Sequence, residues 1–259
     1  MSIYDRVRTV LEREERAVLF TVIEGEPLGA KLLVAEDGSR EGEGPRELAG
    51  LADELIRGAR SRTLEFGGGT VFAEVFAPPP RLLVYGAIDT AEALCRAAKL
   101  IGWRTIVADA RARFATRERV PSADELLVAW PEEALAAVRP DHATAVVVLT
   151  HDDRFDLPAL QGALASEAFY IGALGSRRNQ RRRRERLLEA GVAEHELERI
   201  AGPCGLDLGA ESPAETALSI LAELLAVRAG RPGGRLRDAP TRIHAEPPYP
   251  VASGQRNRI

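Results

Sequence analysis

From Arg81 onward, strand-length apolar runs alternate with stretches of helical periodicity, and this alternation constrains the fold more than any other feature of the sequence. The expected strands are Leu82 to Tyr85, Thr105 to Ala108, Glu125 to Ala129, Ala145 to Thr150 and Ala168 to Ile171. The expected helices lie at residues 90–101, 131–138, 157–166, 177–190 and 213–228. Such alternation is typical of a parallel sheet with helices on both faces. We therefore predict an α/β fold whose C-terminal part, residues 81–230, is a Rossmann-like, doubly wound domain.

The N-terminal part, residues 1–77, has the pattern of a smaller α+β domain. Helices are expected at residues 3–15 and 45–60, and strands at residues 17–23, 30–35, 63–66 and 70–77. The domain boundary is placed at Pro78, Pro79 and Pro80, because consecutive prolines cannot continue a sheet ladder and stiffen the chain. Residues 231–259 are rich in Pro, Gly and Arg without periodicity, so we expect a disordered tail or a strap across the surface.

Composition excludes several classes of function. The formal net charge of -4 gives no bulk electrostatic attraction to nucleic acid or to an anionic membrane. No apolar run approaches the roughly 18 residues that a membrane span needs, and the charged, amphipathic N-terminus has no signal-peptide stretch. We therefore expect a cytoplasmic protein with neither nucleic acid nor a membrane as partner.

The chain has two cysteines, Cys95 and Cys204, with no CxxC pair and no cysteine–histidine ligand spacing. This pattern predicts neither a disulfide framework nor a zinc site. Cys95 shares a helical stripe with Ala91, Leu94 and Ala98 and is expected in the core.

Every candidate binding loop follows an expected strand, which is where ligands bind in open parallel sheets. The first loop runs from Gly86 and matches a dinucleotide fingerprint at Gly86 and at Ala91. Ile88 stands where the second glycine is needed for close approach of a pyrophosphate, and Asp89 is expected to cap the following helix. We therefore expect NAD(P) to bind with a dissociation constant above about 1 mM.

Asp109 ends the second strand, about 20 residues after Gly86, where an acidic residue would bind a ribose hydroxyl. Arg111 and Arg113 follow it and would instead favour a 2′-phosphate. A surface salt bridge is an equal alternative for Asp109.

The second loop places His151 and Asp152 after the fourth strand, where they are expected to point into the crevice at the switch point of the sheet. A histidine beside carboxylates can carry a proton or bind a metal. With no second histidine nearby in sequence, no metal site is predicted.

The third loop, Gly172 to Arg178, is a glycine-framed turn from strand to helix that contains Gly175, Ser176 and Arg177. Free amides, a helix dipole and guanidiniums make such a turn suitable for an anion. The alternative is a Ser-capped helix with a solvated basic face, and most of Arg181 to Arg184 are expected at the surface.

The fourth loop places Gly205 and Asp207 before a helix that begins with a capping box of Ser212 and Glu215. Asp207 is a candidate ligand contact, or else it bonds the amides of its own loop. Together with His151 and Asp152, it is expected to line one crevice.

Read in order, the segments GAIDTA, DAR, LTHD, IGALGSRRN and GPCGLDLGAESPAETALSILAELLA resemble the C-terminal domain of the XdhC/CoxI family, from about Arg81 to Arg228. The resemblance implies an accessory factor that binds the molybdenum cofactor and assists its sulfuration or its insertion into a xanthine dehydrogenase-like molybdenum hydroxylase. The phosphate of molybdopterin would suit the turn from Gly175 to Arg178. The implied partners are that hydroxylase and a sulfur-donating desulfurase, and a homodimer is a further candidate assembly.

The sequence departs from many relatives in two places. It carries Ile88 and Asp89 where relatives often have Gly-His, and the first 77 residues contain no cysteine. Many relatives place one cysteine in the turn that here spans Gly38 to Gly44 and another near Gly67. The missing thiols weaken a role as a covalent sulfur carrier.

No catalytic residue is predicted for the cofactor chaperone. Two alternative functions compete with it. An NAD(P)-dependent oxidoreductase is permitted by the Rossmann-like order alone. The other is a non-catalytic nucleotide-binding or protein-docking module.

Overall fold

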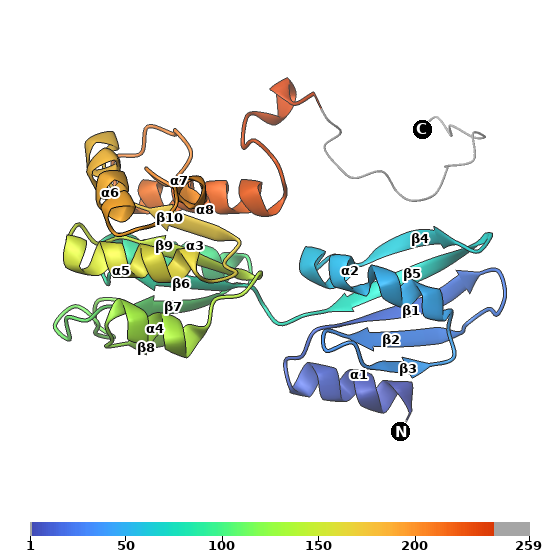
Figure 1. Cartoon of the computed structure of the whole chain (residues 1–259). Helices are drawn as coiled ribbons and strands as arrows, with labels where there is room; N and C mark the ends of the chain where they lie inside the picture. The colour runs from blue at the N-terminus through green and yellow to red at the C-terminus, as the bar shows by residue number, and fades with distance from the viewer. Residues whose placement is uncertain (1, 241–259) are drawn as a thin grey trace, which may run out of the picture. The chain divides into compact units, whose positions relative to one another are not determined.

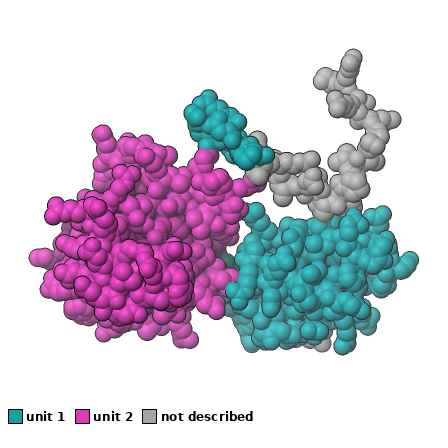
Figure 2. Space-filling view, turned by 45° about the horizontal axis from the view of Figure 1, so that its top comes forward, with its two compact units in different colours: residues 1–78, 235–259 teal, residues 79–234 magenta. Residues whose placement is uncertain are grey.

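The structure is a computed structural model that describes residues 2–240. The chain divides into two compact units, one formed by residues up to Pro78 together with residues 235–240, the other by Pro79–Gly234 (Figures 1 and 2). The division falls within the three consecutive prolines.

The N-terminal unit is a five-stranded antiparallel sheet with strand order β3-β2-β1-β5-β4. Its elements are α1 (Ile3–Glu12), β1 (Ala17–Glu24), β2 (Lys31–Ala35), β3 (Arg40–Gly42), η1 (Arg46–Leu51), α2 (Ala52–Gly58), β4 (Arg62–Phe66) and β5 (Gly69–Phe76). Side chains of β1 alternate between the two faces: Val18 and Phe20 pack with η1 and α2, whereas Leu19 packs with α1. Helices therefore cover both faces of this sheet.

The C-terminal unit is built on a six-stranded, wholly parallel sheet with order β11-β10-β9-β6-β7-β8. Its strands are β6 (Arg81–Tyr85), β7 (Arg104–Ala108), β8 (Glu125–Leu127), β9 (Thr144–Val148), β10 (Tyr170–Ala173) and β11 (Ile200–Ala201). Counted from β6, this is the order 3-2-1-4-5-6 of dinucleotide-binding folds. The strand order reverses between β6 and β9, which is therefore the switch point.

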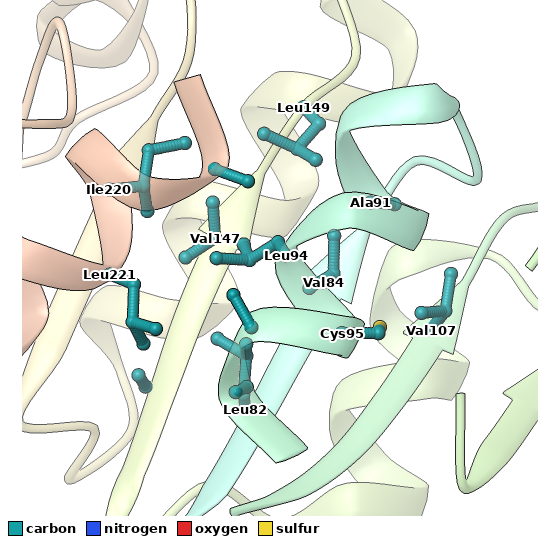
Figure 3. Packing of buried hydrophobic residues seen from close by; sticks show 14 of the residues in the cluster. Leu82, Val84, Ala91, Leu94, Cys95, Val107, Val147, Leu149, Ile220 and Leu221 are labelled. Carbon is teal, nitrogen blue, oxygen red and sulfur yellow. The ribbon is translucent and has the colours of Figure 1, made fainter. Parts of the chain in front are cut away.

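Two apolar layers hold helices on the faces of the parallel sheet. The helices are α3 (Asp89–Leu100), α4 (Pro131–Val138), α5 (Asp153–Leu164), α6 (Arg177–Glu189), α7 (Glu194–Leu197) and α8 (Pro213–Arg228). Leu94 of α3 and Ile220 of α8 pack on Leu82 and Val147 on one face (Figure 3), while Leu160 of α5 and Leu187 of α6 pack on the other. Cys95 lies within the first layer, as predicted (Figure 3).

The predicted α/β fold with a Rossmann-like parallel sheet is confirmed, and the differences concern element bounds and short elements: α5 begins at Asp153, and the helix expected at residues 45–60 is divided into η1 and α2. β3, β11 and α7 were not predicted, and each spans at most four residues. Residues 231–240 of the expected tail contain only the short helix η2 (Leu236–Asp238), and residues 241–259 lie outside the described part of the chain.

No helix between residues 2 and 240 has both the length and the apolar character that crossing a membrane requires.

Candidate functional site

The carboxyl ends of β6, β9 and β10 bring three of the predicted loops together. Gly86 directly follows β6 and lies so close to the loop after β9 that an added Cβ would be 2.9 Å from Cγ2 of Thr150. The amide of Leu174, at the end of β10, donates to the carbonyl oxygen of Val148 at 2.9 Å. The Gly86, His151 and Gly175 loops are therefore neighbours on one edge of the sheet.

The start of α3 differs from a dinucleotide site. Ile88, not Asp89, occupies the N-cap position, so the prediction that Asp89 caps this helix is wrong. Ile88 is half-buried against the core, and Asp89 is exposed with its carboxylate 3.6 Å from a guanidinium nitrogen of Arg119. A negative charge at the start of a helix opposes a bound phosphate, so this geometry supports the expectation of weak NAD(P) binding.

Asp109 is buried rather than placed in a surface salt bridge, which corrects that alternative. Its carboxylate accepts from the amide of Ala87 at 3.0 Å, from the amide of Arg111 at 2.9 Å and from two guanidinium nitrogens of Arg111 at 2.8 Å each. Burial alone would raise the pKa of Asp109, but the hydrogen bonds from Arg111 and Ala87 hold it below its usual value. A ribose hydroxyl could reach this carboxylate only by displacing Arg111.

The loop after β9 ends in a helix cap. Asp152 is the N-cap of α5 and accepts from the amide of Arg154 at 3.0 Å, and the two side chains form an ion pair of 2.6 Å. The hydrogen bonds from Arg154 lower the pKa of Asp152 to about 2. His151 is exposed. Asp152 therefore anchors α5, and His151 is the more accessible side chain of the pair.

The turn after β10 keeps several donors available. Ser176 is the N-cap of α6 and accepts from the amide of Asn179 at 3.2 Å. Within the described part of the chain, the amides of Gly175, Ser176, Arg177 and Arg178 donate to no protein acceptor. Gly175 has φ of +138°, a conformation that favours glycine. The turn thus combines a Ser-capped helix with free amides, so the two readings of its sequence are compatible.

A buried polar network that the sequence did not reveal holds the backbone just before this turn. Arg183 and Asp156 form an ion pair whose side chains are 5% and 2% exposed, and Thr150 donates to the same carboxylate. Arg183 also donates to the carbonyl oxygen of Leu174 at 3.3 Å and to Oε1 of Gln180 at 2.8 Å, and Gln180 donates to Ala173 at 2.8 Å. The residues before Gly175 are thus held by side chains of α6.

The expectation of a surface position does not hold for Arg183, which is buried at the core. The sequence could have indicated this burial, because Arg183 lies four residues before Leu187 and residues at this spacing share one face of a helix. Leu187 lies in the core, so the face that carries it also carries Arg183. Burial of Asp156 was missed because α5 begins at Asp153, four residues before the predicted start.

Gly172 and Gly205 have structural reasons for being glycine. A Cβ at Gly172 would lie 2.6 Å from the ring of Tyr170, and one at Gly205 would lie 2.4 Å from Oγ of Ser219. The amide of Gly205 donates to Glu223 at 2.7 Å, and this carboxylate also accepts from the hydroxyl of Tyr170. These two glycines therefore allow β10 and the fourth loop to pack closely against their neighbours.

Asp207 is exposed, and no hydrogen bond or ion pair joins its side chain to another of residues 2–240. The alternative, in which Asp207 bonds the amides of its own loop, is therefore wrong. No such contact links His151, Asp152 and Asp207 to one another within these residues either. The three follow strands of the same sheet, and a shared crevice remains a prediction. The predicted capping box is confirmed: Ser212 accepts from the amide of Glu215 at 3.2 Å, and Glu215 accepts from that of Ser212 at 2.8 Å.

Metal-ligating side chains do not gather in the described part of the chain, where no group of three His, Cys, Asp or Glu could hold an ion. Both cysteines are buried, and burial raises the pKa of each thiol to about 12. Neither thiol is a ready nucleophile or metal ligand, because the thiolate is the reactive form.

A parallel sheet in this order, with free amides and cationic side chains at one strand end, defines a Rossmann-type protein with a candidate anion-binding turn. Residues 82–224 match the family described as the XdhC Rossmann domain, and the chain belongs to the XdhC family. The predicted family is therefore confirmed.

Three relatives and one solved structure are also similar to this chain. The chain is 36% identical over 171 residues to an uncharacterized protein, YqeB, of Escherichia coli, covering 65% of this chain and 31% of that protein. It is 34% identical to a probable xanthine dehydrogenase subunit of Bacillus subtilis, covering 61% and 46%, and 33% identical to the molybdenum cofactor insertion chaperone PaoD of Escherichia coli, covering 59% and 42%. The chain thus spans less than half the length of these relatives. A crystal structure of a xanthine dehydrogenase from Bacillus halodurans shares the fold, with a TM-score of 0.66, 24% identity and coverage of 87% of this chain and 66% of that one.

Proposed function

We propose that this protein is an accessory factor that binds the molybdenum cofactor and assists its insertion into a xanthine dehydrogenase-like molybdenum hydroxylase. The observation that carries the proposal is the turn from Gly175 to Arg178, whose four amides have no protein acceptor within residues 2–240. A phosphate accepts hydrogen bonds from such amides, and the start of a helix favours its negative charge. The names of two relatives, an insertion chaperone and a probable xanthine dehydrogenase subunit, support the same role.

The cysteines favour holding and delivery over sulfur transfer by this chain. Sulfur transfer through a cysteine requires a thiolate, and both thiols, Cys95 and Cys204, are buried with raised pKa values. We therefore assign sulfuration to a separate sulfur-donating desulfurase that acts while the cofactor is held.

The test compares Gly175→Ala with Gly191→Ala in the full chain. Both glycines have positive φ, +138° at Gly175 and +87° at Gly191, so alanine strains the backbone at each position, and a Cβ at Gly191 meets nothing within 4 Å. We expect Gly175→Ala to weaken binding of inorganic phosphate by about tenfold or more in isothermal titration, and Gly191→Ala to leave it unchanged. The same order should appear in the activation of a co-expressed molybdenum hydroxylase.

Titration of the wild-type chain with NADH and NADPH completes the experiment. Low-micromolar binding of either nucleotide would favour the oxidoreductase reading. Equal phosphate affinity in both glycine variants would remove the turn from the proposed site.

A further inference from the structure

A hollow of about 260 Å³ is lined by α6, α7 and the edge strand β11, which β10 separates from β9 at the switch point. Its cationic wall is Arg177, Arg181 and Arg184, and its apolar lining includes Leu197, Ile200 and Pro203. Gln180 also lines it, and the Nε2 atom of Gln180 lies 3.7 Å from the Cβ position of Gly175. The hollow therefore begins directly beside the turn from Gly175 to Arg178.

The arginines of α6 are not all neutralised by acids. Asp153 pairs with Arg182 at 3.4 Å and with Arg186 at 3.2 Å, and Glu194 pairs with Arg184. By contrast, no carboxylate within residues 2–240 pairs with Arg177 or Arg181. Arg177 and Arg181 repel each other, because like charges four residues apart on a helix are neighbours, and the positive start of α6 also repels Arg177. A bound anion would relieve this repulsion.

The opposite side of the turn is less suitable for a ligand. At the switch point, Ile88 packs against the core, Asp89 adds negative charge, and both oxygens of Asp109 are taken by Arg111 and Ala87. The acids on the switch-point side are thus paired with arginines of their own, whereas the α6 side carries two arginines that no carboxylate within residues 2–240 pairs with.

We propose that the hollow beside α6 holds the planar, partly apolar body of a phosphate ester whose phosphate binds at the Gly175 turn. This inference rests on the proposed function and names where the rest of the ligand lies. Guanidiniums stack on planar rings and donate to ring oxygens, while the apolar lining covers the remaining edge. In this placement, Arg181 contacts the body of the ligand and not its phosphate.

The test measures two dissociation constants in each variant of the full chain, one for inorganic phosphate and one for guanosine monophosphate, which joins a phosphate to a fused two-ring base. In the wild type we expect the ester to bind about tenfold more tightly than phosphate. Arg181→Gln should bring the two constants close together while changing that for phosphate by less than about threefold. Arg186→Gln, which removes the same charge from the same helix away from the hollow, should leave the tenfold preference intact.

The outcomes separate this inference from the proposed function. A preference for the ester that survives Arg181→Gln, or an ester that binds no more tightly than phosphate to the wild type, would overturn the placement in the hollow. If the preference depends on Arg181 while Gly175→Ala has no effect on phosphate, the hollow stands and the proposed phosphate site falls.

Discussion

Two buried aspartates at the carboxyl edge of the parallel sheet are each paired with an arginine. Asp109 is neutralised by Arg111, two residues along the same loop, and Asp156 by Arg183, which comes from another helix. Removing one partner of such a pair leaves an uncompensated buried charge, which is strongly destabilising. Both acids therefore order the loops around the site, and neither is free to bind a ligand directly.

Asp109→Asn should make the chain less stable at neutral pH and less sensitive to acid. The pKa of Asp109 is lower in the folded than in the unfolded chain, so the unfolded chain takes up its proton first as the pH falls. The stabilisation is complete above the ordinary pKa near 3.8 and is lost as the pH falls through that value towards the folded pKa. We expect a loss of about 1–3 kcal/mol at pH 7 in urea unfolding, shrinking between about pH 5 and pH 3. Asp207→Asn, at an exposed position, controls for the change in net charge, and a pH-independent difference for Asp109→Asn would contradict the account.

The sequence predicts residue roles that depend on near neighbours and misses those that depend on the fold. The capping box of Ser212 and Glu215 is visible because both partners lie within one helical turn. The pairing of Asp156 with Arg183 is not, because 27 residues separate them and only the packing of α5 on α6 brings them together. For Asp109, the sequence left two roles open, a contact with a ribose hydroxyl and a salt bridge. It did not show that Arg111, two residues away, binds the carboxylate of Asp109.

At the scale of elements, α6 is a helix whose bounds the sequence predicts well but whose charges do not suit the helix dipole. It has seven arginines and no acidic residue in its first turn, so its charge runs against the helix dipole where the chain enters it. Its interior is held by Leu187 and Arg183 rather than by a continuous apolar stripe. We expect a bound anion to offset this unfavourable arrangement of charge.

Arg178→Gln should therefore stabilise the ligand-free chain while weakening its response to phosphate. Arg178 is exposed in the first turn of α6, and removing its charge relieves its repulsion by the helix dipole. We expect a gain of about 0.3–1 kcal/mol at low ionic strength that disappears near 1 M salt, where screening is nearly complete. Thermal unfolding with and without phosphate measures both effects, and a lower melting temperature in the absence of ligand would refute the electrostatic account.

Element boundaries were predictable where periodicity and caps agree. The starts of α4 and α8 coincide with Pro131 and Pro213 at the first helical position, as expected. The start of α5 was predicted four residues too late, because the cap at Asp152 was not recognised, and Pro158 lies in the interior of this helix. β3 is short and polar, and it forms because β2 offers a free edge, which no local pattern reveals.

At the scale of the whole molecule, each unit closes its own core. The apolar clusters around Phe20 and Leu33 contain only residues of the N-terminal unit, and those around Val84 and Val148 contain only residues of Pro79–Gly234. The family match, residues 82–224, lies entirely within the second unit. The proposed phosphate site and the hollow also lie within it.

A fragment of residues 79–234 should consequently fold and bind phosphate without the rest of the chain. We expect one cooperative unfolding transition and a dissociation constant for phosphate within about twofold of that of the full chain. Circular dichroism during thermal unfolding and titration calorimetry provide the two measurements. A fragment that unfolds without cooperativity, or that folds but loses phosphate binding, would show that the first unit contributes to the site.

The burial of both cysteines makes this protein a convenient subject for fluorescence work. Maleimide dyes react with accessible thiolates, and the two native thiols are buried with pKa values near 12. A single cysteine introduced at an exposed position such as Glu211 would be labelled selectively, with no need to replace the native ones. A dye at that position, four residues beyond Asp207, would report the arrival of a ligand at this edge of the sheet in real time.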